Sequence, residues 1–226
     1  MVPTRVSLIN KLTRPPRADL AIRNYRNLAR DYDSTCTRIG EIRIRALREL
    51  QLRPGETVFD IACGTGTLLP LLARDVGPTG RVIGVDLSPE MAEQARRRAA
   101  EVRGGAQVTI VESPVEFFNP DGAADALLLC YTHDVLQSPA ALDRMLSVSK
   151  PGARIVIVGM KALPWLWGWP LNLFNMYRGR RYLTTYANLD RPWRLLSERG
   201  ARLREVHTAL CGTAYIAVGT LRPPFP

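Results

Sequence analysis

The sequence predicts an α/β protein built on a doubly wound, mostly parallel sheet with helices on both faces. In the middle third of the 226-residue chain, short apolar runs alternate with helical patterns, which is typical of strand–helix–strand units. The first apolar run ends in a glycine-rich turn at residues 64–67 (GTGT). The last two apolar runs are joined by Cys211-Gly212, which is short enough for a hairpin, so the last strand is expected to be antiparallel.

Residues 1–53 are predicted to form a basic, helical N-terminal segment. Apolar residues recur within it at spacings of three and four, as on one face of a helix: Ile39, Ile42, Ala46 and Leu50. Pro54-Gly55 ends this pattern. Residues 54–226 then form the sheet domain.

Five strands are expected before residue 160, with helices between them: 58–62, 81–86, 108–111, 126–130 and 154–159. Ser88-Pro89 begins the helix after the second strand, because Ser is a favoured N-cap and Pro suits the first helical position. A final helix at 191–199 and two strands at 203–210 and 213–221 complete a seven-stranded sheet.

An inserted cap is expected after the fifth strand, at about 161–190, where Trp, Tyr, Pro and Arg are frequent and no clear period is seen. Trp165, Trp167 and Trp169 alternate along the chain. In an extended or broken segment all three indoles would face one way, whereas in a helix they would spread around the axis. We therefore expect an extended or broken segment here.

The charge is distributed unevenly, although the net value is +10. Residues 1–53 carry 12 basic side chains against 5 acidic ones, residues 54–150 carry 8 against 13, and residues 151–226 carry 11 against 3. The two basic flanks suit phosphate, carboxylate or an anionic membrane surface, so charge alone does not name a partner.

The location of the protein is predicted from features that the sequence lacks. It has no apolar run of transmembrane length and no recognisable secretory signal, and its four cysteines include no C-x-x-C pair. We expect a cytoplasmic protein with reduced thiols, with a peripheral membrane contact as an open alternative.

The main functional signal lies at the ends of three predicted strands. Gly64 and Gly66 follow the first strand, where glycine lets a ligand approach the backbone and the next helix offers free N–H groups. Asp86 ends the second strand and is suited to accept both hydroxyls of a ribose. Glu112-Ser113 ends the third strand and offers an acceptor for an adenine amino group. Leu69 occupies the place of the third glycine of a dinucleotide fingerprint, so a dinucleotide is disfavoured.

Together these motifs resemble those of the class I S-adenosylmethionine-dependent methyltransferases, in particular the small-molecule branch that includes ubiquinone- and menaquinone-type enzymes. The resemblance covers residues 32–159 and rests on four segments, with ARDYD at 29–33 before them: VFDIACGTGT (58–67), GVDLSPEM (84–91), VES (111–113) and KPGARIVIVG (150–159). It implies a Rossmann-like fold, S-adenosyl-L-methionine as cofactor, S-adenosyl-L-homocysteine as product, and an N-terminal segment that covers the cofactor site.

The resemblance also assigns cofactor-binding roles to individual residues: Tyr32, Asp60, Ala62, Gly64, Gly66, Asp86, Leu87, Met91, Glu112, Ser113 and Cys130. Among them, Asp60 would help to hold the cofactor ammonium, and Asp86 would bind the ribose. Glu112, which stands where the family usually has Asp, would contact the adenine amino group. Tyr32 would close over the cofactor.

Candidates for catalysis and acceptor binding lie outside these motifs. His133 and Tyr131 follow the fourth strand, and His133 is expected either to act as a general base or to pack beside the loop. The cap supplies the candidates for acceptor binding: Trp165, Trp167, Trp169, Tyr177, Arg178 and Arg181. Aromatic and guanidinium groups suit an apolar acceptor with an anionic end, or a membrane interface. Alternatively, the cap packs onto its own core.

The sequence therefore predicts methyl transfer from S-adenosylmethionine to an N or O atom of a hydrophobic small molecule or lipid. Three alternatives stay open: aminocarboxypropyl transfer from the same cofactor, a non-catalytic cofactor-binding module, and an RNA methyltransferase that uses the basic flanks. Residues 129–134 (LCYTHD) lack the Asn/Asp-Pro-Pro-Tyr/Phe motif of base-amino methyltransferases, which disfavours a nucleic-acid partner. Asp134 alone is too little for a metal site, so no metal is predicted. The oligomeric state is not predicted.

Overall fold

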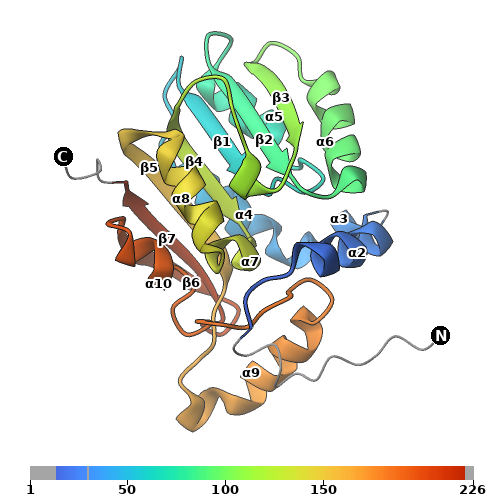
Figure 1. The fold of residues 1–226 in the computed structure, drawn as a ribbon, viewed down its shortest axis with the longest axis vertical. Helices are drawn as coiled ribbons and strands as arrows, with labels where there is room; N and C mark the ends of the chain where they lie inside the picture. Colours follow the sequence, from blue (N-terminus) through green and yellow to red (C-terminus); the bar gives the residue numbers. More distant parts are fainter. Residues whose placement is uncertain (1–13, 30, 222–226) are drawn as a thin grey trace.

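A seven-stranded sheet forms the centre of the computed structural model, which describes residues 14–29 and 31–221 (Figure 1). The strand order is β3-β2-β1-β4-β5-β7-β6. The strands are β1 (Thr57–Ile61), β2 (Arg81–Asp86), β3 (Gln107–Glu112), β4 (Ala124–Cys130), β5 (Ser149–Met160), β6 (Arg202–Ala209) and β7 (Ala214–Thr220). β1 to β5 are parallel, whereas β7 runs antiparallel to both β5 and β6. The predicted fold class, including the closing hairpin, is confirmed.

The helices that the structure describes connect and cover these strands: α2 (Ala18–Leu28), α3 (Tyr32–Thr35), η1 (Thr37–Ile39), α4 (Gly40–Glu49), α5 (Leu69–Val76), α6 (Pro89–Glu101), η2 (Val115–Phe117), α7 (His133–Leu136), α8 (Pro139–Ser147), α9 (Trp165–Gly179) and α10 (Arg194–Glu198). α6 begins where the sequence predicts, with the Ser88 hydroxyl accepting the Met91 N–H at 3.4 Å. The final helix, expected at 191–199, is shorter, and residues 1–13 of the N-terminal segment lie outside the described residues.

The core lies on both faces of the sheet because successive side chains of each strand point to opposite sides. Val58 of β1 joins a cluster that includes Leu72 of α5 and Ala46 of α4. Its neighbour Phe59 joins the cluster on the other face, which includes Met145 of α8. Helices therefore cover both faces, as a doubly wound fold requires.

The N-terminal helices lie across the carboxyl ends of the parallel strands. In Figure 1, α2 and α3 lie beyond the arrowheads of β1 to β3, beside α6. Three side-chain contacts attach this segment to α6: Arg26 pairs with Glu90 at 2.8 Å, the Gln94 amide donates to the Ala29 carbonyl oxygen at 2.7 Å, and Arg98 pairs with Asp33 of α3. The edge of the sheet where the functional motifs end is thereby covered.

The expectation of an extended or broken tryptophan segment is wrong, because residues 165–179 form helix α9. The Asn172 side chain accepts the Leu163 N–H and donates to the Leu163 carbonyl oxygen, both at 2.9 Å. Gly168 packs so closely that an added Cβ would lie 2.3 Å from that of Leu163. These contacts fold the helix back on the preceding segment and offset Pro170 in its interior.

Candidate active site

Two non-glycine residues with left-handed backbone mark the carboxyl edge of the sheet. Ala62 follows β1 with φ +53°, and Tyr131 follows β4 with φ +59°. Side chains rarely adopt this conformation, and such residues gather at functional sites. β1 and β4 are adjacent, and both residues line the same cavity. The chain is thus bent at two neighbouring strand ends to form one wall of a site.

The cofactor cavity, as we name it, is lined by residues from the first two predicted motifs together with residues after β4. Seven of the predicted cofactor residues are among its walls: Tyr32, Ala62, Gly64, Asp86, Leu87, Met91 and Cys130. The remaining four do not line it: Asp60, Gly66, Glu112 and Ser113. The structure therefore brings together the glycine-rich turn, the end of β2 and the start of α6.

Asp86 is the polar centre of this cavity. Its carboxylate accepts the Gly64 N–H at 2.8 Å and the Ser88 N–H at 2.9 Å, so it links the glycine-rich turn to the start of α6. Burial raises its pKa to about 6, and these hydrogen bonds act in the opposite direction. A buried carboxylate with further lone pairs at this edge suits a ligand hydroxyl.

Asp60 lies behind the glycine-rich turn and faces Arg43 of α4. Burial raises the pKa of Asp60 to about 7, while the charge of Arg43 opposes the shift. Arg43 also donates to the Thr67 hydroxyl at 2.6 Å. Sequence reasoning missed Arg43, although it lies four residues after Ile39 and so on the same side of the helical pattern.

The other predicted residues outside the cavity have structural partners. Gly66 (φ +77°) packs so tightly that a Cβ there would lie 2.5 Å from Leu69 Cδ1 and 3.0 Å from Ala95 Cα. Glu112 accepts a hydrogen bond from Arg96 at 3.0 Å. The Ser113 hydroxyl donates to the Pro114 carbonyl oxygen at 2.9 Å. Gly66 thus shapes the turn, while Glu112 and Ser113 are engaged with their neighbours.

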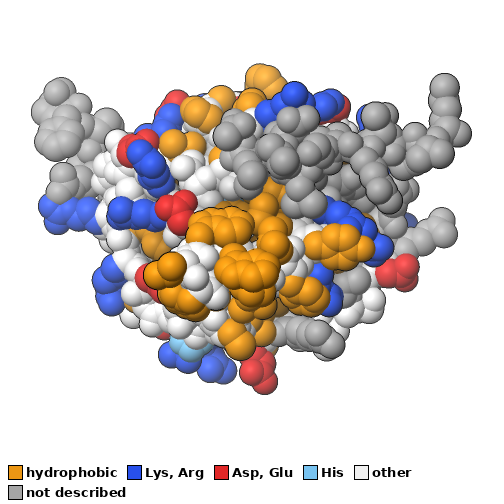
Figure 2. All heavy atoms as spheres, turned by 90° about the horizontal axis from the view of Figure 1, so that it is seen from below, with side chains coloured by type: hydrophobic (Ala, Val, Ile, Leu, Met, Phe, Trp, Pro, Cys, Tyr) orange, Lys and Arg blue, Asp and Glu red, His pale blue; other side chains and the backbone are white. Residues whose placement is uncertain are grey.

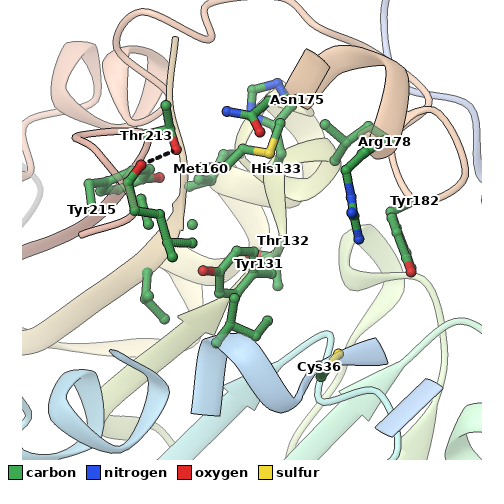
Figure 3. Close-up of a pocket in the computed structure, with 18 of the residues that line it drawn as sticks. Cys36, Tyr131, Thr132, His133, Met160, Asn175, Arg178, Tyr182, Thr213 and Tyr215 are labelled. Atoms are coloured by element: carbon green, nitrogen blue, oxygen red, sulfur yellow. Dashed lines mark hydrogen bonds between the residues drawn. The ribbon is translucent and has the colours of Figure 1, made fainter. Parts of the chain in front are cut away.

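A second cavity of about 210 Å³, which we name the acceptor cavity, adjoins the first (Figure 3). The two share seven lining residues: Tyr25, Tyr32, Tyr131, Thr132, His133, Tyr182 and Leu183. The rest of its wall is mostly apolar and comes mainly from β5, α9 and the β6–β7 hairpin, with further residues from the N-terminal helices and α7; Met160 and Tyr215 are among its members. Of the described residues that line it, Arg178 is the one with a charged side chain at neutral pH.

Three consecutive residues of the shared wall carry buried polar atoms. Tyr131 Oη and Thr132 Oγ1 have no hydrogen-bond partner among the described residues, and the His133 ring interacts with no polar group there other than the Ala187 backbone. Burial lowers the pKa of His133 to about 4, with the Ala187 backbone opposing the shift, and burial raises the pKa of Tyr131. His133 is therefore neutral at pH 7. Because unpaired buried polar groups are costly, their concentration between two cavities points to a ligand.

Tyr32, which belongs to the N-terminal segment, lines both cavities. Its ring meets that of Tyr25 edge-on at 6.0 Å and that of Tyr182 edge-on at 6.3 Å. An added Cβ on Gly64 would lie 3.9 Å from Tyr32 Cε1, so this ring covers the glycine-rich turn. Neither Tyr25 nor Tyr182 was found from the sequence, because they come from separate segments that meet only in the fold.

Only one of the predicted acceptor residues lines a cavity. Arg178 extends into the acceptor cavity near Tyr182 (Figure 3). The others lie elsewhere on or beside α9: Trp165, Trp167, Trp169, Tyr177 and Arg181. The indoles are between 54% and 62% exposed, so they neither fill the cavity nor form the core of the cap.

Asp134, the acidic residue after β4, has a structural role. Its carboxylate accepts the Thr184 hydroxyl at 2.6 Å and the Thr184 N–H at 2.9 Å, which ties α7 to the segment after α9. Among the described residues there is no group of three or more His, Cys, Asp or Glu side chains placed to hold a metal. None of the described helices is both long enough and apolar enough to span a bilayer.

S-adenosylmethionine fits the cofactor cavity. The buried Asp86 carboxylate would accept hydrogen bonds from ribose hydroxyls, and Leu87 and Met91 beside it would offer apolar surface to a purine. Gly64 and Ala62 present backbone, and Cys130 lies across from them at the end of β4. Asp60, whose buried carboxyl interacts with the charge of Arg43, directly precedes this turn in β1 as a further acidic group.

Comparisons with known proteins agree with this arrangement. A model described as "Methyltransferase domain" matches residues 58–152. The demethylmenaquinone methyltransferase of Symbiobacterium thermophilum is 30% identical over 199 residues, covering 77% of this chain and 79% of that protein. The 2-phytyl-1,4-naphtoquinone methyltransferase of Trichormus variabilis is 35% identical over 115 residues, half of each chain.

Solved structures share the fold at lower identity. The N-methyltransferase NodS from Bradyrhizobium japonicum WM9, in complex with S-adenosyl-L-homocysteine, has a TM-score of 0.63 at 16% identity and covers 89% of this chain and 97% of its own. The chain spans 32% to 50% of the length of several other curated relatives. Given the match to the menaquinone enzyme over most of both sequences, the chain belongs to the class I S-adenosylmethionine-dependent methyltransferases of the quinone-biosynthesis type.

Proposed function

We propose that the protein methylates an apolar acceptor that carries an acidic aromatic hydroxyl, of the phenol or quinol class. The observation that carries this proposal is the wall between the cavities, where the buried polar atoms of residues 131–133 lie beside a largely apolar space that Arg178 also lines. Two relatives are named for demethylmenaquinone and 2-phytyl-1,4-naphtoquinone, and the reduced forms of these quinones are quinols of this class.

The positive charge of Arg178 in the wall of the acceptor cavity favours an acceptor that can carry a negative charge. S-adenosylmethionine supplies a methyl group that its sulfonium already activates. Arg178 is placed to stabilise an ionised hydroxyl by a charge-assisted hydrogen bond. Burial lowers the pKa of His133 to about 4, so the neutral imidazole is available to accept a hydrogen bond from the hydroxyl of the acceptor. Catalysis then consists mainly of positioning the ionised acceptor beside the cofactor cavity.

The proposed acceptor determines which atoms can receive the methyl group. The sequence predicts transfer to N or O, whereas relatives such as that of Ectopseudomonas mendocina are named C-methyltransferases. The negative charge of an ionised aromatic hydroxyl is delocalised onto the ring carbon next to the one that bears the oxygen. Both the oxygen and that adjacent carbon are therefore nucleophilic. A protonated nitrogen acceptor would meet the positive charge of Arg178. We therefore propose oxygen or the adjacent carbon.

The proposal is tested by replacing Arg178 and comparing the result with the same replacement of a nearby arginine. Arg178→Gln should lower kcat/KM for a water-soluble quinol or phenol acceptor at least about tenfold, since hydrogen bonds to charged groups contribute roughly 1.5–3 kcal/mol. Affinity for S-adenosylhomocysteine should stay unchanged. Arg180→Gln is the control, because Arg180 lies over the Tyr177 ring at 3.7 Å and does not line the cavity. Equal kinetics for the two variants would contradict the role given to Arg178.

A further inference from the structure

Helix α9 exposes a broad apolar surface, which we name the α9 face: Trp165, Leu166, Trp167, Trp169, Leu173, Phe174 and Tyr177. These side chains are between 48% and 93% exposed. Viewed from the α9 end of the molecule, Figure 2 shows hydrophobic side chains gathered over this helix. A contiguous apolar surface of this kind marks an interaction site.

The opposite side of α9 is firmly packed, so the exposure does not come from a poorly fitted helix. Gly168, Asn172, Met176 and Gly179 are buried at intervals of three and four residues. The Tyr186 hydroxyl donates to the Met176 carbonyl oxygen at 2.7 Å, in addition to the Asn172 contacts with Leu163. The rotation of the helix is therefore fixed, and the α9 face points away from the protein.

The surroundings of the α9 face are basic. Residues 161–189 contain Lys161, Arg178, Arg180 and Arg181 but no Asp or Glu. Arg180 and Arg181 are exposed at the carboxyl end of α9. Indoles with one polar N–H and flanking arginines suit the headgroup region of an anionic bilayer, where the rings enter the apolar boundary and the guanidinium groups meet phosphates.

The α9 face is also adjacent to the acceptor cavity. Asn175 and Arg178, on the same helix, line that cavity (Figure 3). An apolar acceptor dissolved in a bilayer would therefore meet the protein at the helix that forms part of the cavity wall.

We propose that the α9 face binds the headgroup region of an anionic bilayer and that the acceptor enters the acceptor cavity from that bilayer beside α9. The docking stands on the α9 face itself, whereas entry of the acceptor rests on the proposed function. The two parts can be measured separately.

Vesicle flotation at low salt tests the docking with the whole protein. We expect the protein to float with phosphatidylcholine–phosphatidylglycerol vesicles and much less with phosphatidylcholine alone. Three of the four tryptophans lie on the α9 face, and the fourth, Trp193, is buried. Tryptophan fluorescence should therefore shift to the blue and be quenched by brominated lipids when vesicles bind.

Matched variants identify the surface. Trp165→Ser/Trp167→Ser/Trp169→Ser should lower vesicle partitioning at least about tenfold, with S-adenosylhomocysteine binding unchanged. Phe117→Ser is the control, since Phe117 is 74% exposed on η2, which is not part of α9. Arg180→Ser/Arg181→Ser should weaken binding to anionic vesicles in low salt, and the difference should shrink as salt rises. If the triple variant does not fold, Leu166→Ser at the 93% exposed position replaces it.

Three results would overturn the docking: no flotation with anionic vesicles, equal flotation of the tryptophan and Phe117 variants, or a concentration-dependent dimer that the tryptophan variant loses. The last result would assign the α9 face to a second copy. Vesicle binding without methylation of a quinol in the same vesicles would contradict the proposed function and leave the docking intact.

Discussion

Asp33 and Thr65 join the N-terminal segment to the glycine-rich turn, with the Thr65 hydroxyl donating to the Asp33 carboxylate at 2.7 Å. Arg98 of α6 donates to the same carboxylate and also, at 2.6 Å, to the Thr65 carbonyl oxygen. Asp33 directly follows Tyr32, whose ring lines both cavities. The N-terminal segment is thus fixed to the turn at the residue next to that ring.

Asp33→Ala should loosen this attachment. We expect affinity for S-adenosylhomocysteine to fall about tenfold, because Tyr32 is no longer held over the turn and charged hydrogen bonds are lost. The loss of unfolding free energy should be small, about 1 kcal/mol, since the pair is partly exposed. Calorimetry and urea denaturation measure the two effects. Asp19→Ala, which removes an exposed pair with Arg17, is the control, and equal affinities would refute the attachment.

Removing the Asp86 carboxylate tests the cofactor cavity directly. Asp86→Ala should weaken S-adenosylhomocysteine binding at least tenfold, because a charged acceptor for ribose hydroxyls contributes roughly 1.5–3 kcal/mol. Asp86→Asn should also bind weakly, since it replaces the charged acceptor with a neutral amide. Isothermal titration calorimetry gives the comparison. An unchanged dissociation constant for both variants would show that the cavity is assigned wrongly.

His133 should reveal its role in the pH dependence of turnover. If it accepts the acceptor's proton or hydrogen bond, His133→Ala should lower kcat about a hundredfold with cofactor affinity unchanged. Because burial lowers the pKa of His133 to about 4, it stays neutral above about pH 5, and activity should show no loss near pH 6.5 from its protonation. Near-normal turnover of the variant would show that His133 only packs beside the loop.

Asp60 should make the protein less stable as the pH rises. Its folded pKa of about 7 lies above that of the unfolded chain, so its stabilising contribution is complete below about pH 4 and is lost as the pH rises through 7. Asp86, with a pKa of about 6, acts in the same sense. Asp60→Asn should therefore flatten the fall in unfolding free energy between about pH 4 and about pH 7, measured by urea denaturation at a series of pH values. A variant with an unaltered slope would contradict the burial of Asp60.

Much of the fold could be predicted because its signals are local. The alternation of strands and helices, the Ser88 cap and the hairpin at residues 211–212 each depend on residues close in sequence. The prediction for the tryptophan segment was wrong because Pro170 and Gly168 locally disfavour a helix. The helix is instead stabilised by the buried contact of Asn172 with Leu163, which is nine residues away.

The candidate site was predicted only in part for a similar reason. Strand ends place residues such as Asp86 at the edge of the sheet, and seven of the expected cofactor residues indeed line one cavity. Strand position does not fix what a side chain contacts, so Glu112 lies with Arg96 instead. Tyr25 and Tyr182 reach the shared wall from distant segments, and nothing in the local sequence could have placed them together.

The most direct test of the central claim is the identity of both products after turnover with S-adenosylmethionine labelled in its methyl group. The acceptor is a membrane-soluble quinol presented in anionic vesicles, and the products are analysed by mass spectrometry and NMR. We predict S-adenosylhomocysteine together with a quinol that carries the labelled methyl on oxygen or on the adjacent ring carbon. Formation of methylthioadenosine, with an unlabelled aminocarboxypropyl group on the acceptor, would contradict methyl transfer.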